Sequence, residues 1–215
     1  MNAPASVNLI NEVPPAPAGG TSRRDHTLAV GMLVLAAAYA TIRYNIFKGV
    51  PWSDWPGYIA DKVLAVAALL LLALAGWRKL TSRRSTAVVM AWAGLLVIGH
   101  VLLSLGLFSG DYYFDKFIAG RRITSLGGLS LLTGALAVGL LELGARRASA
   151  WTLTGTTASM AGLLGLSAVH TAAPGLAGWL DPRSWPGGLP PLTLLTSAPA
   201  LFVAAMLTVS RRLLR

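Results

Sequence analysis

The chain alternates between long apolar stretches and short polar segments. Six stretches of about 20 residues carry few charges, and this is the length that an α-helix needs to cross the hydrocarbon core of a bilayer. They cover residues 27–46, 58–77, 85–108, 123–143, 150–172 and 192–209. The pattern predicts an all-α bundle of six transmembrane helices, with residues 23–215 forming one membrane domain.

The N-terminal segment, residues 1–22, lacks this hydrophobic pattern. It consists mainly of Asn, Ala, Pro, Ser and Gly, a composition with too little apolar surface to pack. We therefore predict a disordered tail. It does not resemble a signal peptide, because no short apolar core follows a basic start.

Composition supports a membrane protein. The chain is 54% hydrophobic and 12% charged, against roughly 25% charged residues in an average globular protein. The net charge of +10 comes from short basic pairs at the ends of apolar stretches rather than from one stripe, which argues against nucleic-acid binding. Without cysteine the chain has no thiolate metal site and no iron–sulfur cluster, so redox work would require a borrowed cofactor.

The basic residues are distributed unevenly between alternate loops. The N-terminal segment, the second and fourth loops and the C-terminus hold two, four, two and three Lys or Arg residues, while the first, third and fifth loops hold one, three and one. Cytoplasmic loops of membrane proteins are enriched in Lys and Arg. The distribution predicts that both termini are cytoplasmic.

Two histidines stand inside apolar stretches, where ionisable side chains are costly and usually functional. The stretch that contains His100 begins after Arg83-Arg84, and the stretch that contains His170 begins after Arg146-Arg147. At a rise of about 1.5 Å per residue, they lie roughly 22 and 27 Å along helices that run in the same direction. Both are expected in the outer half of the bilayer, at similar depth. Two such imidazoles suit the axial positions of one haem b, and His100 and His170 are therefore the predicted metal ligands.

The surroundings of the two histidines fit this interpretation. Each ring can bind iron through one nitrogen and donate the other N–H to a neighbour, and Ser104 and Ser167 are close in helical register. Haem propionates would project towards the outer surface, where arginine side chains could pair with them. The candidates for that cofactor contact are Arg43, Arg121 and Arg122.

Other ionisable residues are expected to have simpler roles. Asp61 and Lys62, near the start of the second stretch, are predicted to form an interfacial pair. His26 lies beside Arg24 and Asp25 and is predicted to be a surface residue. A zinc site is disfavoured because a closed site needs four ligands and the chain offers two.

This arrangement resembles the ferric reductase-like transmembrane family, which includes six-helix metalloreductases, the membrane haem subunit serving periplasmic methionine sulfoxide reductase and the haem domain of NADPH oxidases. The similarity covers about residues 27–215. Besides the six stretches and the two histidines, it rests on residues 48–52 (KGVPW) and 189–193 (LPPLT). It implies that His100 and His170 are axial haem ligands and that the chain is an oxidoreductase membrane subunit.

The chain departs from the two-haem members of that family. Their additional histidines stand 13 or 14 residues before the outer ones, where this chain has Thr86 or Ala87 and Thr156 or Thr157. The resemblance thus implies a single haem near the outer face. The electron donor stays open between a partner protein carrying flavin and a quinol, because no dinucleotide-binding fingerprint is present.

Three functions compete at this point. The first is electron transfer to an acceptor at the outer face, expected in the inner (plasma) membrane of a bacterium. The second is a non-catalytic membrane scaffold whose histidines only form hydrogen bonds between helices. The third is a small transporter with the histidines in a proton relay, which is weakened because Asp61 and Glu142 lie at the ends of their stretches.

Overall fold

The computed structural model describes residues 20–82, 85–108, 117–119, 122–146 and 153–213. Nearly all of this is helical, and helices occur at all six predicted positions. They are α1 (Gly20–Thr41), α2 (Ala60–Thr81), α3 (Ala87–Leu107), α5 (Ser125–Arg146), α6 (Leu153–Ala172) and α7 (Leu192–Leu213). Residues 1–19 of the predicted N-terminal tail lie outside the described residues, as does Arg121, whereas residues 20–22 form the start of α1.

Five helical segments in the described residues are long and apolar enough to cross a membrane. They are Arg23–Phe47, Trp52–Thr81, Ala87–Leu107, Ser125–Arg146 and Pro186–Arg212. The protein is accordingly an all-α integral membrane bundle. The helix α6 is not among these five segments.

The connections at one end of the bundle contain short helical turns. At that end α1 continues as the π-helix η1 (Ile42–Phe47), followed by η2 (Trp52–Asp54) and the π-helix η3 (Trp55–Ile59) that leads into α2. Between α6 and α7 lie η4 (Leu176–Trp179), η5 (Pro182–Ser184) and η6 (Pro186–Gly188). A minimal antiparallel pair, β1 (Ile118–Ala119) and β2 (Arg122–Ile123), precedes α5.

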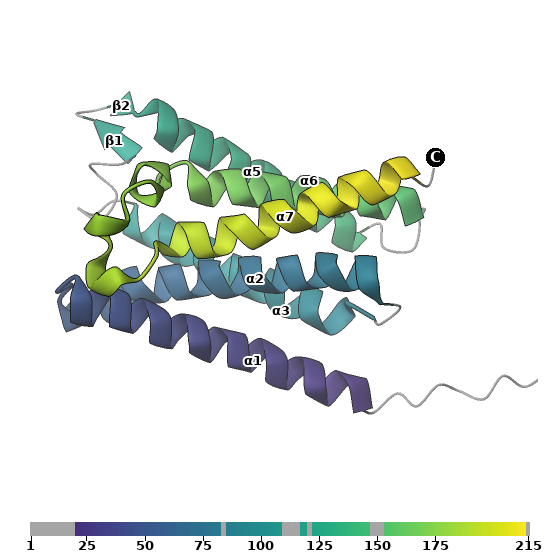
Figure 1. Cartoon of the computed structure of the whole chain (residues 1–215), viewed down its shortest axis with the longest axis horizontal. Coiled ribbons are helices and arrows are strands. Elements are labelled where there is room, and N and C mark those ends of the chain that lie inside the picture. The colour runs from purple at the N-terminus through teal and green to yellow at the C-terminus, as the bar shows by residue number, and fades with distance from the viewer. Residues whose placement is uncertain (1–19, 83–84, 109–116, 120–121, 147–152, 214–215) are drawn as a thin grey trace, which may run out of the picture.

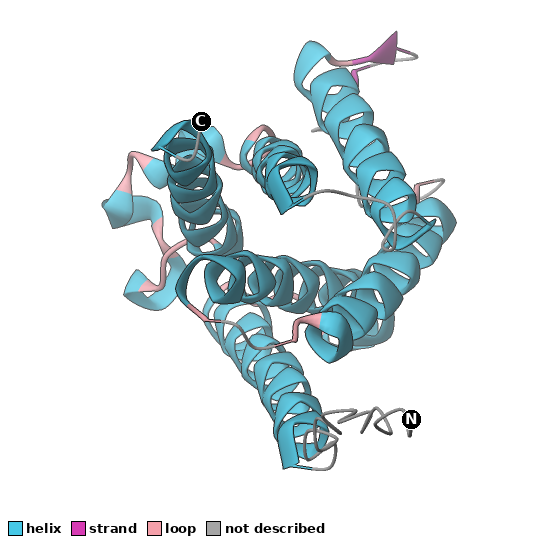
Figure 2. Ribbon diagram, turned by 90° about the vertical axis from the view of Figure 1, so that its right-hand side faces the viewer, coloured by secondary structure: helices cyan, strands magenta, loops and turns pink. Residues whose placement is uncertain are grey.

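The helices run alternately up and down the bundle. In Figure 1 the starts of α1, α3 and α6 and the ends of α2, α5 and α7 lie at the right-hand end. We call this the terminal end; the η and β segments lie at the opposite, turn-rich end. Figure 2 views the bundle from the terminal end and shows the six helices side by side.

The core is organised around α2, which packs against α1, α3, α6 and α7. Its buried residues lie on all sides of the helix, as expected of a helix surrounded by neighbours. At Gly76 the packing is very close: a Cβ there would lie 2.8 Å from Val203 Cγ1 and 2.9 Å from Leu164 Cδ1. The outer helices instead expose large apolar side chains such as Leu35 and Leu102, which suits contact with lipid.

A buried ion pair joins α1 to α2 near the terminal end. Arg78 Nη2 donates to Asp25 Oδ1 over 2.8 Å, and both side chains are almost fully buried. A hydrogen bond also joins α1 to α3, since Trp92 Nε1 donates to His26 Nδ1 over 2.8 Å. His26 is exposed, in agreement with its predicted surface position.

Candidate functional site

The structure brings His100 of α3 and His170 of α6 together. Their ring centroids are 6.2 Å apart and the ring planes are inclined by 68°. Both residues lie towards the turn-rich ends of their helices, which run in the same direction (Figure 1). The two histidines, which helical rise predicts to lie at similar depth, are therefore also close to each other.

Asp61 contacts His100 at this site. Its Oδ1 lies 2.8 Å from His100 Nδ1 and accepts a hydrogen bond from Ser104 Oγ at 2.9 Å. Ser104 Oγ is also 3.4 Å from His100 Nδ1. Because residues four apart share a helix face, His100 and Ser104 together approach the first turn of α2. Asp61 is only 2% exposed.

Asp61 therefore contacts His100, a partner that was not predicted from the sequence. Consecutive residues on a helix point in different directions. Lys62 Nζ instead lies 3.9 Å from the centre of the Tyr58 ring and 5.6 Å from that of Tyr44. Although Asp61 lies at the end of its apolar stretch, its carboxylate thus contacts one of the two histidines.

His170 is held by α5. Its Nδ1 lies 2.7 Å from the backbone oxygen of Ser130 and 3.2 Å from Ser130 Oγ, and that hydroxyl donates to the backbone oxygen of His170 at 2.9 Å. Ser130 is 1% exposed. The hydrogen-bond partner of His170 is thus Ser130 rather than the predicted Ser167.

These contacts define the tautomers of both rings. A carbonyl oxygen and an ionised carboxylate only accept hydrogen bonds, so Nδ1 of each ring carries the hydrogen. In the neutral imidazoles the lone pair then lies on Nε2. Metal-binding histidines have this arrangement, with the second nitrogen donating to a carboxylate or backbone carbonyl.

A glycine makes room for the His170 ring. An ideal Cβ at Gly134 would lie 2.7 Å from His170 Nδ1 and 3.0 Å from its Cε1, closer than side chains tolerate. Gly134 is four residues after Ser130 and so occupies the same face of α5. Gly134 therefore allows an imidazole, rather than another helix backbone, to approach α5 closely.

The two histidine-bearing helices do not form an extended contact within the described part of the chain. The helix α3 packs on α2, and α6 packs on α5, α7 and α2. Of the apolar residues that flank the histidines at helical spacing, Leu96 and Leu163 are buried. The rings therefore approach each other from two helices that both pack on α2.

The three candidate arginines have different environments. Arg43 lies in η1 and is buried; its Nη1 donates to the backbone oxygen of Leu189, and its Nε has no hydrogen-bond partner in the structure. Arg122 is exposed in β2. Arg121 lies outside the described residues. Arg43 therefore has a buried N–H without a hydrogen-bond partner.

The described residues contain no group of three or more His, Cys, Asp or Glu side chains able to hold a metal ion. The site consists of two imidazoles, each fixed through Nδ1 by a different helix. No protein-family model matches the chain, and neither a curated protein nor a solved structure shows significant similarity to it.

Proposed function

We propose that His100 and His170 are the axial ligands of one haem b, and that the protein is a ferric reductase-like membrane subunit that transfers electrons to an acceptor at the outer face. The observation that carries this proposal is the pair of imidazoles, each hydrogen-bonded through Nδ1 and with its lone pair on Nε2, whose centroids are 6.2 Å apart.

The separation of the rings supports binding to one metal. The ring centroids are 6.2 Å apart, and a histidine nitrogen binds a metal at about 2.0 Å, so both imidazoles could hold the same metal. Haem supplies four further nitrogens itself, so two protein ligands complete its coordination, whereas a bare zinc ion would need more.

The residues of this chain would set the electronic properties of the site. Haem, when bound, supplies reversible one-electron chemistry. The Asp61 carboxylate would increase the basicity of the His100 ring through its hydrogen bond to Nδ1–H, and the Ser130 carbonyl would do the same more weakly for His170. The unpartnered Nε–H of buried Arg43 is available to a propionate oxygen.

The charge distribution supports an orientation. Arg23, Arg24, Arg211 and Arg212 lie at the terminal end, as expected for a cytoplasmic side. We infer that α6 crosses the membrane as the sixth span and that the histidines lie near the outer face. Electrons would come from a flavin-carrying partner or a quinol, in a bacterial inner membrane.

An absorption spectrum tests the proposal. The purified full-length protein should show a Soret band and α and β bands that sharpen on reduction with dithionite, with one haem b per chain by pyridine haemochrome. His100→Ala and His170→Ala should each abolish the low-spin spectrum, while His26→Ala should retain it. Full haem loading in both site variants, or a colourless wild-type protein expressed with ample haem, would disprove the ligand assignment.

A proton relay is the second candidate, and the contact between Asp61 and His100 favours it. A buried carboxylate, two imidazoles and the Ser104 and Ser130 hydroxyls form a polar cluster inside an apolar bundle, as proton pathways do. This function predicts a haem-free protein whose proton flux into vesicles is lost in Asp61→Asn. A haem-free protein without such flux would leave only the scaffold role.

A further inference from the structure

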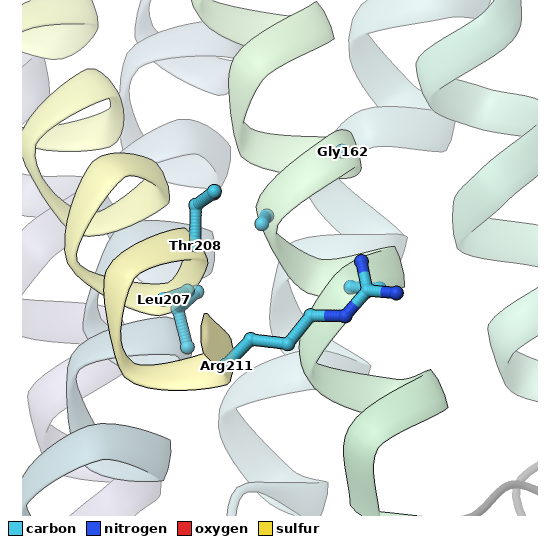
Figure 3. A pocket seen from close by; sticks show the side chains of 6 residues that line it. Gly162, Leu207, Thr208 and Arg211 are labelled. Atoms are coloured by element: carbon cyan, nitrogen blue, oxygen red, sulfur yellow. The ribbon is translucent and has the colours of Figure 1, made fainter. Parts of the chain in front are cut away.

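A small cavity opens between α6 and α7 near the terminal end of the bundle, away from the histidines. It has a volume of about 250 Å³ and is lined by Ala158, Ala161, Gly162, Leu207, Thr208 and Arg211. Figure 3 shows Arg211 leaving α7 and extending across towards α6. The small residues at positions 158, 161 and 162 occupy one face of α6 and leave the space that the arginine crosses.

The Arg211 guanidinium lacks an anionic partner in the described residues. Its Nε is buried and has no hydrogen-bond acceptor. The carboxylates of the terminal end are already engaged, Asp25 with Arg78 and Glu142 with Arg146. A buried guanidinium N–H without an acceptor is costly, so the cavity is chemically suited to an anion.

An apolar stripe continues from the cavity towards the middle of the membrane. Leu201, Ala205 and Thr208 are spaced at four and three residues along α7, and all three are exposed, so they form a continuous lipid-facing surface. An anion bound beside Arg211 could therefore lay a hydrocarbon chain along α7. Soluble phosphate would make no use of this surface.

We propose that this cavity binds the phosphate headgroup of an anionic phospholipid, with Arg211 as the charged contact. Basic pockets between membrane helices on the cytoplasmic side suit such headgroups. The charge of the guanidinium and its N–H donors match a phosphodiester, and the cavity volume suits a headgroup rather than a whole lipid. This site does not depend on haem or on the histidine pair.

Native mass spectrometry of the full-length protein in neutral detergent, with added phosphatidylglycerol, tests the proposal. One phosphatidylglycerol should bind saturably, and phosphatidylcholine at least about tenfold more weakly. Arg211→Gln should reduce phosphatidylglycerol affinity about tenfold, whereas Arg212→Gln, which removes the neighbouring exposed charge, should change it less than threefold. Equal losses of phosphatidylglycerol affinity in the two variants would show that only general surface charge matters and would overturn the proposal.

Two further arms complete the test. Ala158→Leu fills the cavity and keeps every charge, so it should lose phosphatidylglycerol binding as Arg211→Gln does; this variant also tests the site if Arg211→Gln does not fold. Millimolar inorganic phosphate should not displace the lipid. Displacement by phosphate, or unchanged lipid binding in Ala158→Leu, would show that the acyl chain and the cavity are irrelevant and would overturn the assignment.

Discussion

The Asp61 carboxylate lies 2.8 Å from Nδ1 of His100, and the two residues come from neighbouring helices that run in opposite directions. The contact fixes the imidazole tautomer and directs its lone pair to Nε2. It also places a negative charge beside the proposed iron ligand, so the carboxylate should tune the site rather than bind metal itself.

Replacing Asp61 with Asn should change the redox properties more than the occupancy of the site. Loss of the negative charge makes His100 a less basic ligand, which raises the haem midpoint potential and weakens haem binding about tenfold. A potentiometric titration followed at the α band measures the first effect. Asp54→Asn, a change at the same end of the bundle, is the control, and an unchanged potential in Asp61→Asn would contradict the positioning role.

Gly134→Ala should disturb His170 directly. The added methyl group would meet the ring at 2.7 Å, so either the imidazole or α5 must move. We expect loss of the low-spin haem spectrum with helical content retained by circular dichroism. Gly139→Ala on the same helix is the matched control, because a Cβ there meets nothing within 4 Å. Equal spectra for the two variants would show that the ring has room to shift.

The ion pair between Asp25 and Arg78 should contribute to stability. Removing one partner of a buried pair leaves the other charge uncompensated and costs about 3 kcal/mol. Asp25→Asn should therefore lower the unfolding midpoint in detergent clearly. Glu142→Gln breaks an exposed pair with Arg146 and should cost less than about 0.5 kcal/mol. Similar losses of unfolding free energy in the two variants would mean that burial does not determine how much an ion pair contributes to stability.

The absence of cysteine from the sequence allows a direct topology test. Ser53→Cys in η2 should react with a membrane-impermeant maleimide in intact cells, because it lies at the turn-rich end. Thr81→Cys at the end of α2 should react only after lysis. Both positions are exposed. The reverse labelling pattern would invert the proposed orientation, and labelling of both in intact cells would contradict the placement of the ends on opposite sides.

Hydrophobic pattern was sufficient to locate the helices because each is set by a long local run of apolar residues. The helix ends agree with the predicted stretches to within several residues; for example, α2 (Ala60–Thr81) corresponds to the predicted stretch 58–77. The depth of His100 and His170 followed from helical rise alone.

The partners of the histidines could not be predicted in the same way. Ser130 and Gly134 are ordinary members of a Gly- and Ser-rich stretch, and their role depends on which face of α5 meets α6. Asp61 was assigned to its sequence neighbour Lys62, although residues one apart on a helix diverge. The spacing of His100 and Ser104, four residues apart, was the available signal for a shared polar partner on another helix.

The contributions of α2, α3, α5 and α6 to one site have a consequence for biogenesis. Chains are synthesised and fold from the N-terminus, so Asp61 and His100 can meet while the later helices are still being made. His170 joins them only after the fifth hydrophobic stretch has left the ribosome. Acquisition of the proposed haem would therefore be a late event, and a chain truncated before residue 170 would contribute a single imidazole to the site.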